Sequence, residues 1–188
     1  MKKNKVKKII LVLVGEKLSG KEMVSRYLVK HYGFVSFRFS KILVDILKII
    51  NLPVTRVNEI NLISGLRERF GAAILAEVIV EKIRRGIKRR VVIDGLRHPA
   101  EYDVLSKLPG FKLVYITAGL QTRFARAKAR GEKVGETHFT LQQFKREEKM
   151  PTEIYIKRLG KRAQVKIINE GSLNNLYSEI KKKLSKNI

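Results

Sequence analysis

Cysteine is absent from this 188-residue sequence, which excludes disulfide bonds and thiol chemistry. Histidine is scarce: His31, His98 and His138 are scattered along the chain, without the spacing of metal ligands. No Ser-His-Asp nucleophile arrangement can be read from them either. The composition therefore argues against a thiol, zinc or serine-hydrolase centre.

Long apolar runs are also missing. The run from Ile9 to Val14 is far too short to span a bilayer, and Gly15 and Glu16 end it. Lysines precede this run, but because it leads into a glycine-containing loop we expect no signal peptide. These absences favour a cytoplasmic protein with no membrane partner.

Acidic residues are few. The chain has 17 Asp and Glu against 41 Lys and Arg, a formal net charge of +24. Such a protein attracts polyanions, and nucleic acid and small polyphosphates are the two candidate partners. The alternative is a solvated, lysine-rich surface, since the terminal clusters Lys2 to Lys8 and Lys181 to Lys186 can serve solubility alone.

The most informative stretch is residues 15–21, Gly-Glu-Lys-Leu-Ser-Gly-Lys, between an apolar run and a segment of helical period. This context and spacing are those of a phosphate-binding P-loop, although Glu22 stands where Ser or Thr is usual. Glycine lets backbone N–H groups curl around phosphate oxygens, and the helix start adds its own. The alternative is a tight turn with a chance match. The predicted phosphate-binding residues are Gly15, Glu16, Lys17, Leu18, Ser19, Gly20, Lys21 and Glu22.

Strand and helix patterns alternate along the chain. Strands are expected near residues 8–14, 34–39, 91–94, 111–116 and 165–168, with helices between them. The order predicts an α/β fold: a doubly wound, mostly parallel five-stranded sheet with helices on both faces. We expect one domain over 1–188, with a helical acceptor-binding insertion at about 53–86 and a lid at about 131–152. Ser40, Thr140 and Ser172 are expected to cap helices.

Asp94 ends the third expected strand, so it reaches the same sheet edge as the P-loop. An acid there can hold Mg²⁺ or accept a proton from an attacking hydroxyl. The alternative is a turn residue before Gly95. Glu22 is a second candidate magnesium ligand because a carboxylate is a hard oxygen donor; alternatively it points to solvent and Asp94 alone positions the metal.

Arginines gather around the expected mouth of the site. Arg38 ends the second strand, Arg67 lies in the insertion and Arg97 follows Asp94. Guanidinium groups clamp phosphate or carboxylate with paired hydrogen bonds, so these three predict an acceptor with an anionic group. Each alone is also compatible with a solvated surface.

A second arginine group precedes the expected lid. Arg123, Arg126 and Arg130 share one helix face. Arginines on a lid can neutralise charge on a transferring phosphoryl group, and we select Arg126 and Arg130 for this role. With Lys21 and Asp94, they complete the predicted catalytic set. The alternative is again a solvated helix face.

Three segments carry a family resemblance: Val91 to Arg97 with Glu101 after it, Arg123 to Gly131, and Ile168 to Leu173. With the P-loop, they make the chain similar to P-loop kinases of the nucleoside monophosphate kinase superfamily, nearest to the archaeal dephospho-CoA kinase-like proteins. The Ser-Gly-Lys-Glu form of the loop also resembles the Ser-Gly-Lys-Asp of deoxynucleoside monophosphate kinases and animal-type phosphomevalonate kinases.

This resemblance implies transfer of the γ-phosphoryl group of ATP, with Mg²⁺, to a small phosphorylated or nucleotide-like acceptor, such as a nucleoside monophosphate or dephospho-CoA. Two other functions stay open. The charge of +24 is compatible with a nucleic-acid-binding protein or polynucleotide kinase that has a P-loop nucleotide site. Glu22 is compatible with a nucleotide binder that has lost catalysis.

Overall fold

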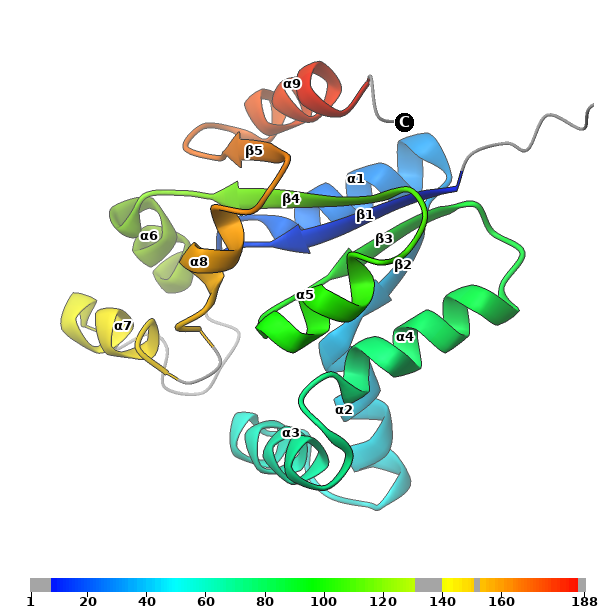
Figure 1. The fold of residues 1–188 in the computed structure, drawn as a ribbon. Coiled ribbons are helices and arrows are strands. Elements are labelled where there is room, and N and C mark those ends of the chain that lie inside the picture. Colours follow the sequence, from blue (N-terminus) through cyan, green and yellow to red (C-terminus); the bar gives the residue numbers. More distant parts are fainter. Residues whose placement is uncertain (1–7, 131–139, 151–152, 186–188) are drawn as a thin grey trace, which may run out of the picture.

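The computed structural model describes residues 8–130, 140–150 and 153–185. Its centre is one five-stranded sheet, all parallel, in the order β2-β3-β1-β4-β5. Helices cover both faces of this sheet (Figure 1). The predicted fold class is confirmed.

The elements follow the predicted alternation closely. The strands are β1 (Ile9–Val14), β2 (Val35–Arg38), β3 (Arg90–Asp94), β4 (Phe111–Thr117) and β5 (Val165–Ile168). The helices are α1 (Lys21–Tyr32), α2 (Phe39–Ile49), α3 (Arg56–Phe70), α4 (Ile74–Arg85), α5 (Pro99–Leu105), α6 (Leu120–Arg130), α7 (Leu141–Glu147), α8 (Ile156–Gly160) and α9 (Leu173–Leu184).

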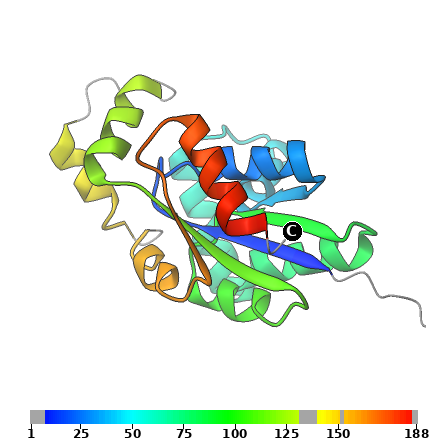
Figure 2. The same cartoon turned by 90° about the horizontal axis from the view of Figure 1, so that it is seen from above.

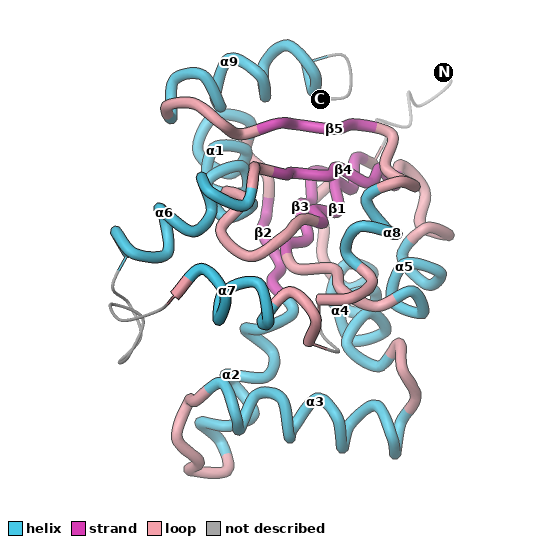
Figure 3. Tube along the Cα trace, turned by 90° about the vertical axis from the view of Figure 1, so that its left-hand side faces the viewer, coloured by secondary structure: helices cyan, strands magenta, loops and turns pink. Residues whose placement is uncertain are grey.

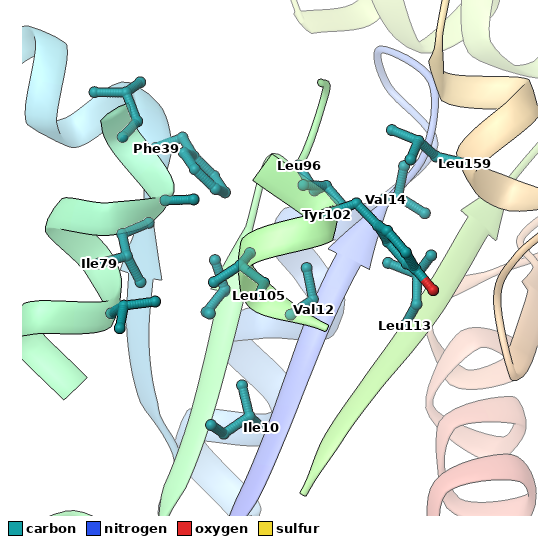
Figure 4. Packing of buried hydrophobic residues seen from close by; sticks show 14 of the residues in the cluster. Ile10, Val12, Val14, Phe39, Ile79, Leu96, Tyr102, Leu105, Leu113 and Leu159 are labelled. Carbon is teal, nitrogen blue, oxygen red and sulfur yellow. The ribbon is translucent and has the colours of Figure 1, made fainter. Parts of the chain in front are cut away.

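Strand β1 divides the core between the two faces of the sheet. Ile10, Val12 and Val14 point to one face, where they join side chains of α4, α5 and α8 (Figure 4). Leu11 and Leu13 point to the other face and join α1 and α9, which lie beside one another (Figure 2). The alternation is that of a strand, and burial on both faces explains why the run is entirely apolar.

Helices α2 and α3 extend from the sheet on the side away from α9 (Figure 3). Helix α3 buries fully only Ile63, so most of its surface is partly or fully exposed. Helix α4 instead packs firmly on the sheet through a buried stripe. That stripe comprises Leu75, Ala76, Ile79, Val80 and Ile83. The segment expected as an insertion thus combines one projecting helix with one that contributes to the core.

Most helix ends are where the sequence places them, but one cap is wrong. Thr140 and Ser172 cap α7 and α9 as predicted, each through its side-chain oxygen. Ser40 does not cap α2, because that helix begins at Phe39 and has Arg38 as its N-cap. Phe39 is buried in the core, and this packing draws it into the first turn.

Two further expectations concern membranes and the lid. Among the described residues, no helix is long and apolar enough to cross a bilayer. The predicted lid at 131–152 falls partly outside those residues, which here include only 140–150, most of it helix α7.

Candidate functional site

A cavity of about 1340 Å³ lies at the carboxyl ends of the strands. A pocket for one drug-sized ligand is typically about 300–1,000 Å³, so this space suits two ligands side by side. The P-loop forms one wall, and helices α2, α3 and α7 contribute others. The predicted site residues that line it are Glu16, Lys17, Leu18, Gly20, Lys21, Glu22, Arg38, Arg67, Asp94, Arg97 and Arg126.

Two glycines make the P-loop conformation possible. A Cβ on Gly15 would lie 2.0 Å from the carbonyl oxygen of Ile116, so only glycine lets the loop pass this close to β4. Gly20 has φ +98°, and a Cβ there would lie 2.3 Å from Nδ2 of Asn169. Glycine at both positions therefore lets the loop pack tightly against β4 and Asn169.

Lys21 is turned into this loop. Its Nζ donates to the carbonyl oxygens of Gly15 at 2.7 Å and Glu16 at 2.8 Å. Burial, together with the positive charge of Arg97, lowers the pKa of the lysine to about 8. An ammonium group this desolvated is held mainly by carbonyl dipoles, so a phosphate would be a far stronger partner.

Arg126 of α6 and Asn169, which follows β5, hold the P-loop through hydrogen bonds. Arg126 donates to the carbonyl of Leu18 at 3.2 Å and to that of Asn169 at 2.8 Å. The Asn169 amide donates in turn to the carbonyl of Ser19 at 2.9 Å. Arg126, predicted as a lid residue, therefore lies directly against the phosphate loop.

The other two arginines of this helix differ. Arg123 is buried, donates to the carbonyl of Ala118 and is ion-paired with Glu148, so it joins α6 to the end of α7. Arg130 is the last residue of α6, and its side chain lies outside the described part of the chain. Its predicted catalytic role therefore stays a prediction.

Asp94 lies at the floor of the cavity beside the P-loop. Only 6% of the residue is exposed, and its Oδ2 lies 3.6 Å from Nε of Arg38. Its Oδ1 is buried and accepts no hydrogen bond from the described residues. Burial raises the pKa of this carboxyl group, and the positive charge of Lys21 opposes the rise. A buried acceptor without a donor is suited to a cation or to a substrate hydroxyl.

Glu22 and Asp94 come together through one arginine. Oε1 of Glu22 lies 2.8 Å from Arg26 and 3.4 Å from Arg38, which also contacts Asp94. Within the described ranges, no group of three or more Asp, Glu, His or Cys side chains could hold a metal. Mg²⁺ usually binds one or two carboxylates together with water and phosphate oxygens, so the pair fits that ion and not a fully protein-caged metal.

Another part of the cavity holds arginines paired with acids. Arg67 lies 2.8 Å from Glu101, whose other oxygen accepts the backbone N–H groups of Arg97 and His98. The Arg97 side chain is ion-paired with Glu153. The structure thus brings Arg38, Arg67 and Arg97, far apart in sequence, to one cavity.

Several residues of this site were not predicted from the sequence. Asn169, Glu153 and Arg56 were not among the predicted site residues, although they line the cavity. Tyr115, whose hydroxyl is hydrogen-bonded to Glu16, was also missed. Only Asn169 had a usable signal, since it directly follows the last strand and so lies at the same sheet edge as Asp94.

Comparison with known proteins finds relatives that share one description. No protein-family model matches it. A protein described as UPF0200 protein from Hyperthermus butylicus is 26% identical over 179 residues, 95% of each chain. Another, from Methanothermobacter thermautotrophicus, is 35% identical over 66 residues, only 35% of each chain. A third, from Methanoregula boonei, is 28% identical over 141 residues, 73% of this chain and 77% of the relative.

Solved structures show the same fold. Shikimate kinase from Aquifex aeolicus has a TM-score of 0.57 and 19% identity, covering 95% of this chain and 98% of that one. Shikimate kinase from Acinetobacter baumannii, in complex with shikimate, gives 0.55 and 16%, covering 92% and 90%. A gluconokinase from Sinorhizobium meliloti gives 0.51 and 15%, covering 91% and 88%. The chain has the fold of small P-loop kinases.

Proposed function

We propose that this protein is an ATP-dependent phosphotransferase that moves the γ-phosphoryl group to a small acceptor with an anionic group. One observation carries the proposal: a single cavity joins the P-loop, the buried carboxylate of Asp94 and three arginines. The kinase fold of its structural neighbours supports this reaction class. A nucleoside monophosphate or dephospho-CoA is our candidate acceptor.

On the nucleotide side, the backbone of residues 15–21 and Lys21 would hold the ATP phosphates. Arg126 braces the loop from behind through the carbonyl of Leu18, which fixes its shape before the nucleotide arrives. Asp94 and Glu22 would hold Mg²⁺, which offsets phosphate charge during transfer.

On the acceptor side, Asp94 would orient the attacking group. An acceptor oxygen bonds to the γ-phosphorus while the bond from that phosphorus to the bridging oxygen breaks, and ADP leaves. If the attacking group is a hydroxyl, its proton passes to Asp94, whose buried Oδ1 accepts no hydrogen bond from the described residues and can take it. Arg38, Arg67 and Arg97 would position the acceptor's anionic group.

The direct test is a screen for ATP-to-ADP conversion with nucleoside monophosphates, dephospho-CoA and short oligonucleotides. We expect one acceptor class to raise ADP formation well above the rate with ATP alone, with one phosphate added to the product by mass spectrometry. If every acceptor leaves the rate at background, the proposed function is wrong. Replacing ATP by GTP in the same screen determines the donor.

The lowered pKa of Lys21 predicts a pH-dependent affinity for ADP. Phosphate binding stabilises protonated Lys21, so binding draws in a proton when Lys21 of the ligand-free protein is neutral. Because the pKa of Lys21 in the ligand-free protein is about 8, we expect the affinity for ADP to be about tenfold weaker at pH 9 than at pH 7. Calorimetry in buffers of different ionisation enthalpy measures the affinity and the proton uptake together. No uptake at pH 8.5 would contradict this role of Lys21.

Arg67→Ala is expected to raise KM for the acceptor about tenfold and to leave KM for ATP unchanged, since one charge-assisted hydrogen bond is lost. Its partner Glu101 stays fixed by the backbone N–H groups of Arg97 and His98, so the cavity wall is retained. Arg69→Ala on the same helix is the matched control and should change neither constant. Steady-state kinetics with each substrate varied in turn checks both; equal effects on the two substrates would contradict the assignment.

The charge of +24 favours a second candidate, a polynucleotide end as the acceptor. It predicts RNA or DNA binding that weakens steeply with salt and survives mutation of Lys21. Filter binding at two salt concentrations, with wild type and Lys21→Ala, distinguishes this acceptor from a small molecule.

A further inference from the structure

Glu153 places a carboxylate between two arginines of the cavity. Its Oε1 is ion-paired with Nη1 of Arg97 and lies 3.5 Å from Nη2 of Arg56. The Glu153 side chain is only 10% exposed, whereas those of Arg56 and Arg97 are 39% and 30% exposed. A single oxygen of the chain therefore sits where two guanidinium groups converge.

Two guanidinium groups beside the same oxygen repel each other, and an anion between them offsets that repulsion. Burial lowers the pKa of Arg97 to about 10, and the positive charge of Arg56 is the next largest cause. Planar guanidinium forks bind the oxygens of carboxylate and phosphate groups in the same way. The position of Oε1 of Glu153 thus marks a ready-made anion subsite.

The neighbouring pair, Arg67 and Glu101, is built differently. Glu101 completes the capping box of α5 through the N–H of His98, so it belongs to the helix start and is only 2% exposed. Glu153 lies outside the regular elements, three residues before α8, and its carboxylate caps no helix start in the described part of the chain. Glu101 is thus part of the helix start, whereas Glu153 occupies the anion subsite between Arg56 and Arg97.

We propose that Glu153 is an internal competitor of the acceptor: its carboxylate occupies the Arg56–Arg97 subsite, and the acceptor's anionic group binds by displacing it. This inference rests on the proposed function, because it assigns the subsite to the acceptor of that reaction.

Displacement sets a threshold on the acceptor's charge. An acceptor with a carboxylate would replace one carboxylate, that of Glu153, by another. Because Glu153 is part of the chain, its effective concentration at the arginines is millimolar or higher, and the acceptor must compete with it. A phosphate group carries up to two negative charges and three strong acceptor oxygens, so it surpasses that rival. Because the cost of displacing Glu153 is common to every ligand, only a ligand that binds the arginines more strongly than a carboxylate keeps useful affinity, and a phosphate-bearing acceptor meets that condition.

The test compares methylphosphonate with acetate, two small ligands that differ in the anionic group. Both are titrated at constant ionic strength, because the protein's net charge would otherwise attract any anion. Saturating ADP keeps the methylphosphonate out of the P-loop, and calorimetry or ligand NMR gives the dissociation constants. We expect wild type to bind methylphosphonate at least tenfold more tightly than acetate.

Glu153→Gln removes the rival's charge and keeps its shape. The cost of displacement is the same for both ligands, so we expect each to bind about tenfold more tightly to this variant. If Glu153→Gln binds the two ligands no more tightly than wild type does, Glu153 is a structural brace and the proposal is wrong. If wild type binds methylphosphonate and acetate equally tightly, the acceptor's charge sets no threshold, and the proposal is also wrong.

Matched variants keep the test decisive. Glu147→Gln removes one negative charge from the same cavity and should change both affinities less than twofold; an effect as large as that of Glu153→Gln overturns the proposal.

Arg97→Ala should abolish methylphosphonate binding. Binding that persists in this variant would place the anion outside the Arg56–Arg97 subsite and overturn the proposal. If Glu153→Gln fails to fold, Glu153→Asp, whose carboxylate is drawn back by one carbon, should tighten binding about threefold, and no change again overturns the proposal.

These titrations involve no turnover, so they are independent of the reaction. If the acceptor screen finds no transfer while the titrations behave as expected, the proposed function fails and the competed subsite stands. If transfer is found but Glu153→Gln leaves anion binding unchanged, the kinase stands and this inference fails.

Discussion

Lys21→Ala is expected to lower turnover by about 10²–10³-fold, the cost of removing one preorganised charge-stabilising group from an active site. Its ammonium group lies 2.7 Å and 2.8 Å from two carbonyls of the P-loop, at the place where phosphate oxygens would bind. Steady-state assay of ADP formation with the identified acceptor measures the loss. Full turnover by this variant would contradict the whole reading of residues 15–21.

The same substitution should leave the fold intact. The pKa of Lys21 lies below that of a free lysine, so the folded state disfavours its charge, and at pH 7 the substitution removes that unfavourable term. We therefore expect a melting temperature equal to or above that of wild type. Lys30→Ala is the matched control: it removes an exposed lysine in the last turn of α1, outside the residues that line the cavity, and it should change turnover about twofold at most.

Asp94→Asn is expected to lower turnover by about 10²–10⁴-fold, the range for loss of a general base. The amide keeps the size of the side chain, but it neither accepts a proton nor binds Mg²⁺ as a carboxylate does. The assay is ADP formation across a magnesium titration, and we expect the variant to need more Mg²⁺ for its residual rate. A variant with wild-type turnover and magnesium dependence would remove Asp94 from the mechanism.

The melting temperature of Asp94→Asn distinguishes a loss of catalysis from misfolding of the variant. Burial raises the pKa of Asp94, so the charged form is disfavoured in the folded protein and its contribution to stability falls as pH rises above the unfolded value. A neutral amide removes that penalty, and we expect the melting temperature at pH 7 to stay the same or increase. Asp103→Asn on α5 is the control; this exposed residue lies 3.8 Å from Arg162, and its loss should leave turnover unchanged.

Local pattern was enough to predict the fold. Strand β5 has the predicted bounds, Val165–Ile168, and the Thr140 capping box is confirmed. These features depend on residues a few positions apart, whose hydrogen bonding and periodicity are written in short stretches of sequence. Position at the carboxyl end of a parallel strand likewise brought Asp94 to the P-loop, because the topology sends all such ends to one edge.

Residues that act through distant contacts could not be predicted in this way. Glu153 meets Arg97 and Arg56 across 56 and 97 positions, and no local pattern pairs an acid with those arginines. The Ser40 cap was wrong for a related reason, since burial of Phe39 in the core overrides the preference of serine for a helix start. Tertiary packing decides such positions, and composition does not encode it.

The bond between Asn169 and the P-loop also bears on how the protein is made. Ser19 and Asn169 are 150 positions apart, so the loop emerges from the ribosome long before its brace. A nascent chain that ends before β5 has the phosphate-loop sequence but lacks the asparagine amide that holds Ser19. The P-loop therefore gains this brace only when β5 has joined the edge of the sheet.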